Sequence, residues 1–258
     1  MSKQQNKKYW DFKAATVHGE GDLYIYGDIT SWKTDDGDTS AKSFKRDLDA
    51  LGDIGRLNLY INSPGGSVFE GVAIGSMLKR HKAHITVYID ALAASIASVI
   101  AMAGDIIRMP RNAMMMIHNP WDFVMGNAEE LRKAADDLDR IGGSMKESYL
   151  SKTGEKITPE KLTELLDAET WLSAQECLNY GLCDVVEEAN QAAACVSNEL
   201  FAKYRNVPED IAAKLNEPEQ PQASTSDEET TAYLQRIKDT AGLELQNINS
   251  YLGGIING

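Results

Sequence analysis

The sequence predicts an α/β domain with a sizeable parallel sheet. Between about Leu23 and Val186, short apolar strand patterns alternate with amphipathic helical patterns. Glycine and proline turns separate several of these patterns. The chain has 258 residues, of which 43% are apolar, so it can bury a substantial core.

Three strands and two helices are expected in the first part of this region. The segment Leu57-Asn-Leu-Tyr-Ile61 alternates apolar positions, as a strand does, and a Pro-Gly-Gly turn follows it. From Val68 onward the apolar residues instead recur near helical spacing. The expected strands are Leu23–Ile29, Leu57–Ile61 and Ile85–Ile89, and the expected helices are Thr39–Leu51 and Val68–Arg80.

The most apolar stretch runs from Ala91 to Gly104. It is shorter than the roughly 18 apolar residues that a membrane-spanning helix needs. We interpret it as a buried core helix, with the helix itself at Ala94–Ala103. Short strands are expected next, at 106–109 and 114–117.

A long, charge-rich helix is predicted from Asn127 to Tyr149. Asn127 is a good N-cap, and two glutamates follow in the first turn, where the helix dipole favours them. This helix should project or lie exposed, with a bend at Gly142-Gly143. Two shorter helices are expected after it, Thr158–Leu166 and Ser173–Tyr180, the second ending at Gly181.

The composition changes after Val186. Residues 216–229 are polar, acidic and proline-containing, which is typical of a disordered linker. We therefore predict a folded domain at 1–190 and an acidic, largely disordered tail at 191–258. Within the tail, Thr231–Leu252 has a loose helical pattern, which is either an amphipathic partner-binding helix or a weakly helical segment without a specific partner.

Charge and targeting signals exclude several functional classes. The net charge of −13 argues against a duplex nucleic acid partner, which needs clustered Lys and Arg. The polar, basic N-terminus lacks the apolar stretch of a secretory signal. The three cysteines show no metal-ligand pattern and suit a reducing compartment. We expect a cytoplasmic protein that uses no membrane, metal or cofactor.

Three local features point to nucleophilic catalysis, and the first is the turn Asn62–Ser67. It lies between an apolar strand and a helix. The backbone N–H groups of Gly65 and Gly66 can approach a ligand closely there, as an oxyanion hole requires. A plain strand-to-helix turn is the alternative interpretation.

The second feature is Ser95, which lies just after a strand and at the start of a small-residue helix. A nucleophile gains there from the helix N-terminal field, and the N–H of Ile96 can help to bind an oxyanion. Ser98 lies one turn further into the same helix. Either serine, taken alone, is better explained as a small packing residue.

The third feature is His118, at the end of a strand pattern and before a proline-bounded loop. Of the other histidines, His18 is near the polar N-terminus, and His81 and His84 lie in a polar connection. His118 is therefore the best candidate for a general base, with a hydrogen-bonded loop histidine as the alternative.

A catalytic triad also needs a carboxylate. Asp167 and Glu169 both precede the strand-like Thr-Trp-Leu segment. Because side chains two positions apart in an extended stretch share a face, local sequence cannot choose between them.

Together these segments resemble the Clp protease proteolytic subunit (ClpP), and more specifically its divergent relatives in phages and prophages. The resemblance covers about Leu23 to Val186. It rests on four ordered segments, which are Tyr60-Ile-Asn-Ser-Pro-Gly-Gly66, Ala93-Ala-Ser95, Met116-Ile-His118-Asn-Pro120 and Leu172-Ser-Ala-Gln-Glu-Cys-Leu-Asn-Tyr-Gly-Leu-Cys-Asp184.

The resemblance implies a spiral fold of ββα units, shared with crotonases, and homo-oligomeric rings that enclose the active sites. It makes the domain at 1–190 a serine endopeptidase with Ser95 as nucleophile and His118 as base. Gly65 or Gly66, together with Ile96, would supply the oxyanion hole.

The acid departs from the family pattern. An ungapped reading puts Glu169 where the family has aspartate, and Asp167 would serve only after a two-residue slip. We favour Glu169 as the triad acid.

The same resemblance implies protein or peptide substrates. Phage capsid or scaffold proteins and an AAA+ unfoldase are the candidate partners, and any ATP use belongs to the unfoldase because no P-loop motif occurs here. An acyl-CoA hydratase or isomerase and a Ser–Lys peptidase fit the motifs less well. Glu169 and the long tail also allow a catalytically inactive assembly or scaffold protein.

Overall fold

The computed structural model of the chain describes residues 8–14, 19–31, 33–34, 37–191 and 204–208. The chain divides into two compact units, Met1–Leu215 and Asn216–Gly258, and every described residue belongs to the first. The predicted boundary at residue 190 therefore falls inside the first unit. The predicted linker at 216–229 and the predicted helix Thr231–Leu252 lie outside the described residues.

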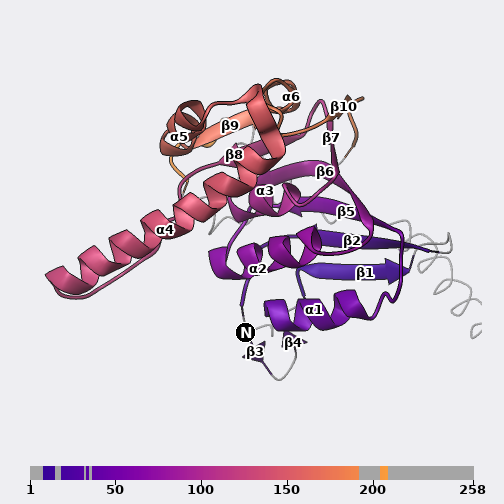
Figure 1. Cartoon of the computed structure of the whole chain (residues 1–258), viewed down its shortest axis with the longest axis horizontal. Coiled ribbons are helices and arrows are strands. Elements are labelled where there is room, and N and C mark those ends of the chain that lie inside the picture. Colours follow the sequence, from indigo (N-terminus) through magenta and orange to yellow (C-terminus); the bar gives the residue numbers. More distant parts are fainter. Residues whose placement is uncertain (1–7, 15–18, 32, 35–36, 192–203, 209–258) are drawn as a thin grey trace, which may run out of the picture. The chain divides into compact units, whose positions relative to one another are not determined.

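The first unit is built on an eight-stranded sheet (Figure 1). Its main path runs β1-β2-β5-β6-β7-β10, and β8 pairs with both β6 and β9. The β1·β2 and β8·β9 pairs are antiparallel and the others parallel, which confirms the predicted α/β class. The strands are β1 (Trp10–Ala14), β2 (Glu20–Tyr26), β5 (Arg56–Ser63), β6 (His84–Ala94), β7 (Ile106–Pro110), β8 (Met114–Ile117), β9 (Thr170–Ser173) and β10 (Val185–Glu187); β3 (Lys33–Thr34) and β4 (Gly37–Asp38) form a separate ribbon.

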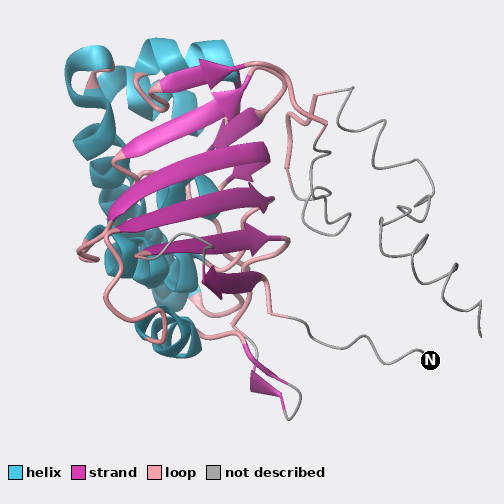
Figure 2. Cartoon of the chain, turned by 90° about the vertical axis from the view of Figure 1, so that its right-hand side faces the viewer, coloured by secondary structure: helices cyan, strands magenta, loops and turns pink. Residues whose placement is uncertain are grey.

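The helices gather on one side of the sheet (Figure 2). They are α1 (Ala41–Asp49), α2 (Val68–Lys79), α3 (Ile96–Ala101), α4 (Ala128–Thr153), α5 (Pro159–Asp167) and α6 (Ala174–Tyr180), with a 3-10 turn at Gly154–Lys156. Helix α3 is buried along its whole length. None of the helices in the described part of the chain is long and apolar enough to cross a membrane.

Local capping explains where the later helices begin and end. Asn127 caps α4 in a capping box with Glu130, and Ser173 caps α6 in the same way. Gly181 ends α6 with a left-handed φ of 77°, as the sequence predicts. Helix α4 continues through the predicted bend at Gly142-Gly143 without a break and projects from the body of the first unit (Figure 1).

The structure shortens the predicted core helix at Ala94–Ala103 to Ile96–Ala101, and the apolar stretch before it is not helical. Residues Ala91–Ala94 instead form the end of β6, and α3 begins only at Ile96. Alanine favours helices in isolation. Here, however, Leu92–Ala94 pair with Met114–Met116 of β8, and the small side chains are buried in the interior. Strand pairing therefore overrides the local propensity.

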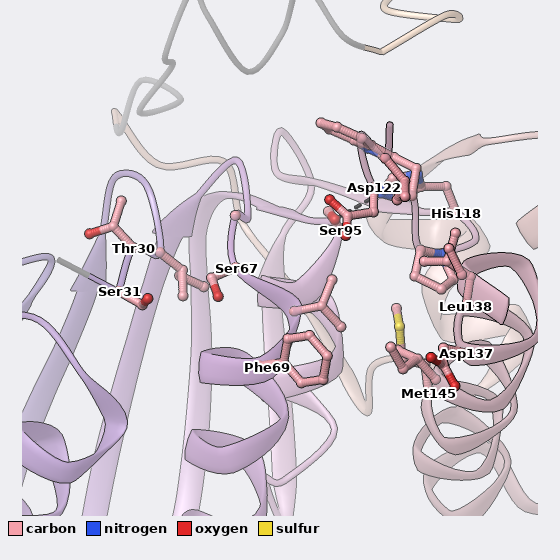
Figure 3. A pocket seen from close by; sticks show the side chains of 18 of the residues that line it. Thr30, Ser31, Ser67, Phe69, Ser95, His118, Asp122, Asp137, Leu138 and Met145 are labelled. Atoms are coloured by element: carbon pink, nitrogen blue, oxygen red, sulfur yellow. Dashed lines mark hydrogen bonds between the residues drawn. The ribbon is translucent and has the colours of Figure 1, made fainter. Parts of the chain in front are cut away.

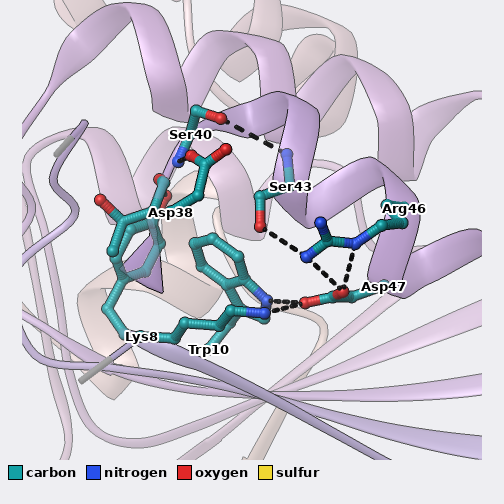
Figure 4. Close-up of polar contacts among 9 residues, drawn as sticks. Lys8, Trp10, Asp38, Ser40, Ser43, Arg46 and Asp47 are labelled. Carbon is teal, nitrogen blue, oxygen red and sulfur yellow. Dashed lines mark hydrogen bonds and ion pairs between the residues drawn. The ribbon is translucent and has the colours of Figure 1, made fainter. Parts of the chain in front are cut away.

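The sequence patterns do not predict strand β1. Polar side chains at and next to this strand bind α1 (Figure 4). Asp47 of α1 accepts hydrogen bonds from Lys8 Nζ at 2.6 Å and from Trp10 Nε1 at 3.0 Å. Burial acts to raise the pKa of Asp47, but these bonds outweigh it and hold the pKa below its usual value. The ionised carboxylate thus links the N-terminal edge of the sheet to its first helix.

Candidate active site

Ser95 occupies the corner between β6 and α3. Its backbone has φ 54° and ψ −128°, a conformation that non-glycine residues rarely adopt. The Ser95 N–H donates to Met116 O at 2.9 Å, which fixes the corner against β8. Gly65 lies directly against it, since a Cβ on Gly65 would come within 2.7 Å of the Ser95 Cβ. The corner places Ser95 at the end of β6, where it lines a cavity.

His118 follows β8 and lies beside Ser95 because β6 and β8 pair in parallel. Ala94 is opposite Met116, so the two side chains emerge one and two residues beyond that pair. His118 Nε2 lies 2.7 Å from Ser95 Oγ, within hydrogen-bonding distance. The structure thus brings the predicted nucleophile and the predicted base together.

Burial governs the basicity of His118, whose side chain is 5% exposed. Burial disfavours the imidazolium and lowers the pKa below the ordinary 6.5, which the negative charge of Glu169 opposes and the positive charge of Arg205 reinforces. The lowered pKa favours the neutral imidazole, which is the form that can accept the Ser95 proton.

Of the three expected oxyanion donors, Gly65 is already engaged. Its N–H donates to Ser63 Oγ at 3.1 Å. The N–H of Ile96 starts α3 and so has no acceptor within the helix. No acceptor within the described part of the chain pairs with the N–H of Gly66. The geometry therefore leaves Gly66 and Ile96 as the available pair.

Gly66 is held in place by the chain before it. Ile29 N–H donates to Gly65 O at 2.8 Å, and Ser67 N–H donates to Ile29 O at 2.7 Å. A Cβ on Gly66 would lie 2.1 Å from Ile29 O, so a residue with a side chain cannot occupy this position without moving the backbone.

The two candidate acids lie in different surroundings. Asp167 is exposed and accepts a hydrogen bond from Asn119 Nδ2 at 2.6 Å. Glu169 is 4% exposed and has a φ of 52°; Ser95 and Glu169 are the non-glycine residues with positive φ in the described ranges. Glu169, and not Asp167, has the charge that raises the pKa of His118.

Glu169 does not bind the imidazole directly. Its Oε1 accepts hydrogen bonds from the backbone N–H groups of Arg205 at 2.5 Å and Asn206 at 2.9 Å. No hydrogen bond between Glu169 and His118 occurs in the part of the chain that the structure describes. The carboxylate acts on the histidine through its charge in this conformation.

Ser98 has a structural role. It is fully buried, donates to Ser95 O at 2.5 Å, and lies 2.6 Å from Tyr149 Oη of α4. Among the cysteines, Cys177 and Cys183 are buried, and burial raises the pKa of both thiols, that of Cys183 to about 11. Neither thiol is an available nucleophile.

Ser95 and His118 open onto a cavity of about 640 Å³. Figure 3 shows Ser67 and Phe69 on one side of Ser95, and His118, Leu138 and Met145 on the other. The lining is mainly apolar, and its residues include Ile29, Val68, Phe69, Val124, Leu138, Ile141 and Met145. Such a cavity suits an apolar side chain of a bound peptide.

Tyr204 also lines this cavity, although it was not among the site residues predicted from the sequence. It lies in the segment predicted as a disordered tail, and the local composition around it carries no catalytic motif. Its position depends on a contact between residues far apart in the chain, for which the sequence offered no signal.

An α/β protein with a serine and a neutral histidine hydrogen-bonded at the ends of neighbouring parallel strands has the arrangement of a serine hydrolase. The comparison with known families gives the particular group. Residues 36–190 match the family model of the Clp protease. The chain belongs to this family, which implies a peptidase. The matched region contains Ser95, His118 and Glu169.

Proposed function

We propose that the chain is a serine endopeptidase that cleaves proteins through an acyl-enzyme. Ser95 is the nucleophile, His118 is the general base, and Glu169 is the acid that stabilises the imidazolium. The observation that carries this proposal is the 2.7 Å contact between Ser95 Oγ and His118 Nε2 at the mouth of an apolar cavity.

The chemistry follows from these groups. The Ser95 hydroxyl proton passes to His118 while Oγ bonds to the scissile carbonyl carbon, and the N–H groups of Gly66 and Ile96 bind the resulting oxyanion. His118 then protonates the leaving amine as the C–N bond breaks. Water attacks the acyl-enzyme and loses its proton to His118, and His118 then returns that proton to Ser95 Oγ as the ester bond breaks and the new carboxyl end is released.

Homo-oligomeric assembly around the active sites is part of the proposal, and so is a fold of ββα units in a spiral. Apolar side chains support the assembly, since Phe69, Phe123 and Met125 are 73%, 88% and 91% exposed. Phe123 and Met125 lie two residues apart in the loop before α4, and exposed apolar patches of this kind are typical of protein interfaces.

The resemblance to phage and prophage relatives supports a cytoplasmic enzyme that matures capsid or scaffold proteins. General proteolysis with an AAA+ unfoldase is the second biological setting. Incubating the purified chain with a cognate capsid precursor, without ATP, separates the two, because maturation needs no unfoldase whereas folded-protein degradation does.

An inactive scaffold protein is the alternative function. The hydrogen bonds that Glu169 makes to Arg205 and Asn206, in place of His118, favour it.

The test is hydrolysis of an unfolded protein such as casein by the parent chain and by Ser95→Ala. The proposal predicts a loss of at least about 10³-fold in kcat/KM. Ser98→Ala is the matched control and should keep its activity per folded molecule. A parent chain that is folded and oligomeric but cleaves nothing would support the scaffold function instead.

A further inference from the structure

Residues Tyr204–Asn206 contact the base and the acid of the candidate active site and the loop that carries the oxyanion glycines. The Tyr204 hydroxyl donates to Pro64 O at 2.5 Å, next to the oxyanion glycines. Its ring packs edge-on against His118, with 5.5 Å between the ring centroids. Burial raises the pKa of the Tyr204 phenol, and a hydrogen bond with Ser95 opposes that shift. One tyrosine thus contacts the nucleophile, the base and the oxyanion loop.

The next two residues engage the acid. The backbone N–H groups of Arg205 and Asn206 both donate to Glu169 Oε1, and Asn206 Nδ2 donates to Ala168 O at 2.8 Å. The Arg205 guanidinium adds an ion pair to Glu169, 3.9 Å from Nε to Oε2. These bonds engage Oε1, one of the two oxygens of the carboxylate that a triad needs for the imidazole.

Apolar packing holds the segment in place. Tyr204 is 7% exposed and forms a small cluster with Leu92, Ala94 and Met116, while Trp171 and Val207 pack around it. The cluster lies apart from the main core. The segment therefore docks through a buried aromatic ring as well as through hydrogen bonds, which makes the docking specific.

The docked segment and a bound substrate would engage the same residues, Ser95, His118 and Glu169. A peptide carbonyl must approach Ser95 Oγ, yet the serine side chain is 7% exposed with Tyr204 beside it. The acid must hold the imidazolium, yet it binds the segment. We propose that Tyr204–Asn206 is an inhibitory segment that competes with substrate for the active site, and that its release activates the enzyme. This inference rests on the proposed peptidase function.

A positioning role for the segment is the opposite interpretation. There, the two N–H groups would hold Glu169 ready for catalysis, and weakening the segment would slow the enzyme. The sign of the effect therefore distinguishes inhibition from positioning.

The test measures the second-order rate constant for covalent labelling of Ser95 by a fluorophosphonate, using the full chain. Tyr204→Ala should react about tenfold faster than the parent or more, because the change removes a buried ring and the hydrogen bond to Pro64 O. Tyr204→Phe keeps the ring and should fall between the two. Ser95→Ala provides the unlabelled baseline.

A second pair of variants tests the same proposal even if Tyr204→Ala does not fold. Arg205→Pro removes one N–H donor to Glu169 at an exposed position, and it should also accelerate labelling. Arg205→Ala keeps that N–H and is the matched control, with a smaller change expected.

The outcomes test the inhibitory segment and the proposed peptidase function separately. Faster labelling of Tyr204→Ala and Arg205→Pro supports the inhibitory segment. Unchanged or slower labelling of both, with a labelled parent, overturns it and leaves the peptidase assignment intact. Folded variants that never label at Ser95 overturn the proposed function, and this inference with it.

Discussion

Ser95 and Glu169 share an uncommon backbone conformation, with φ values of 54° and 52°. A non-glycine residue in a sparsely populated region of φ/ψ space destabilises the folded state by about 1–3 kcal/mol. Such a conformation persists only where the surrounding structure enforces it. Such residues gather at functional sites. The backbone thus singles out Glu169 over Asp167 independently of any hydrogen bond.

The choice of acid leads to a prediction for two matched variants. Glu169→Gln removes the charge that stabilises the imidazolium, and it should lower kcat/KM by about 10²- to 10⁴-fold. Asp167→Asn alters an exposed carboxylate bound to Asn119 and should change the rate less than about threefold. Steady-state cleavage of a fluorogenic peptide measures both, and the reverse ranking would make Asp167 the acid.

The pH profile tests the state of His118. Burial lowers its pKa below 6.5, so the neutral base persists to lower pH than for an exposed histidine. The acidic limb of kcat/KM should therefore fall below pH 6.5. Arg205→Ala removes a positive charge that lowers this pKa, and the limb should move to higher pH. A parent limb above pH 7 would contradict this account.

At the scale of elements, Ser98 joins α3 to α4 through Tyr149. Ser98→Ala leaves the fully buried Tyr149 hydroxyl without this partner, which should cost about 1–3 kcal/mol of unfolding free energy. Denaturant titration measures the cost. The double variant Ser98→Ala/Tyr149→Phe should recover part of it. Equal stabilities of parent and Ser98→Ala would show that the contact contributes nothing.

Several elements were predictable because their signals are local. The strand at Leu57–Ile61, the helix from Val68, and the caps Asn127 and Gly181 all follow from periodicity or capping. The start of the core helix, predicted at Ala94, is wrong because Ala94 pairs with Met116, more than 20 positions away, which no local pattern reveals.

At the scale of the whole molecule, the motifs predicted the Ser95–His118 pair because each residue follows its own strand. The engagement of Glu169 by Arg205 and Asn206 was beyond prediction. That contact joins positions 36 and 37 residues apart. Arg205 and Asn206 also lie within residues 191–258, which the sequence predicts to be a largely disordered tail.

The projecting helix α4 and the loop before it lead to a prediction about assembly. Phe123 and Met125 are almost fully exposed, and we expect an oligomer to cover them. Phe123→Glu/Met125→Glu should reduce the mass measured by light scattering to that of smaller species. Arg132→Glu, an exposed polar position on α4, is the control. An unchanged mass would place the interface elsewhere.

The central claim is that Ser95, activated by His118, is the nucleophile. Its most direct test is peptide mapping by mass spectrometry after long exposure of the folded chain to a fluorophosphonate. The account predicts one adduct per chain on the peptide that contains Ser95, lost in Ser95→Ala and greatly reduced in His118→Ala. A folded parent without an adduct, or an adduct at another residue that survives in Ser95→Ala, would contradict it.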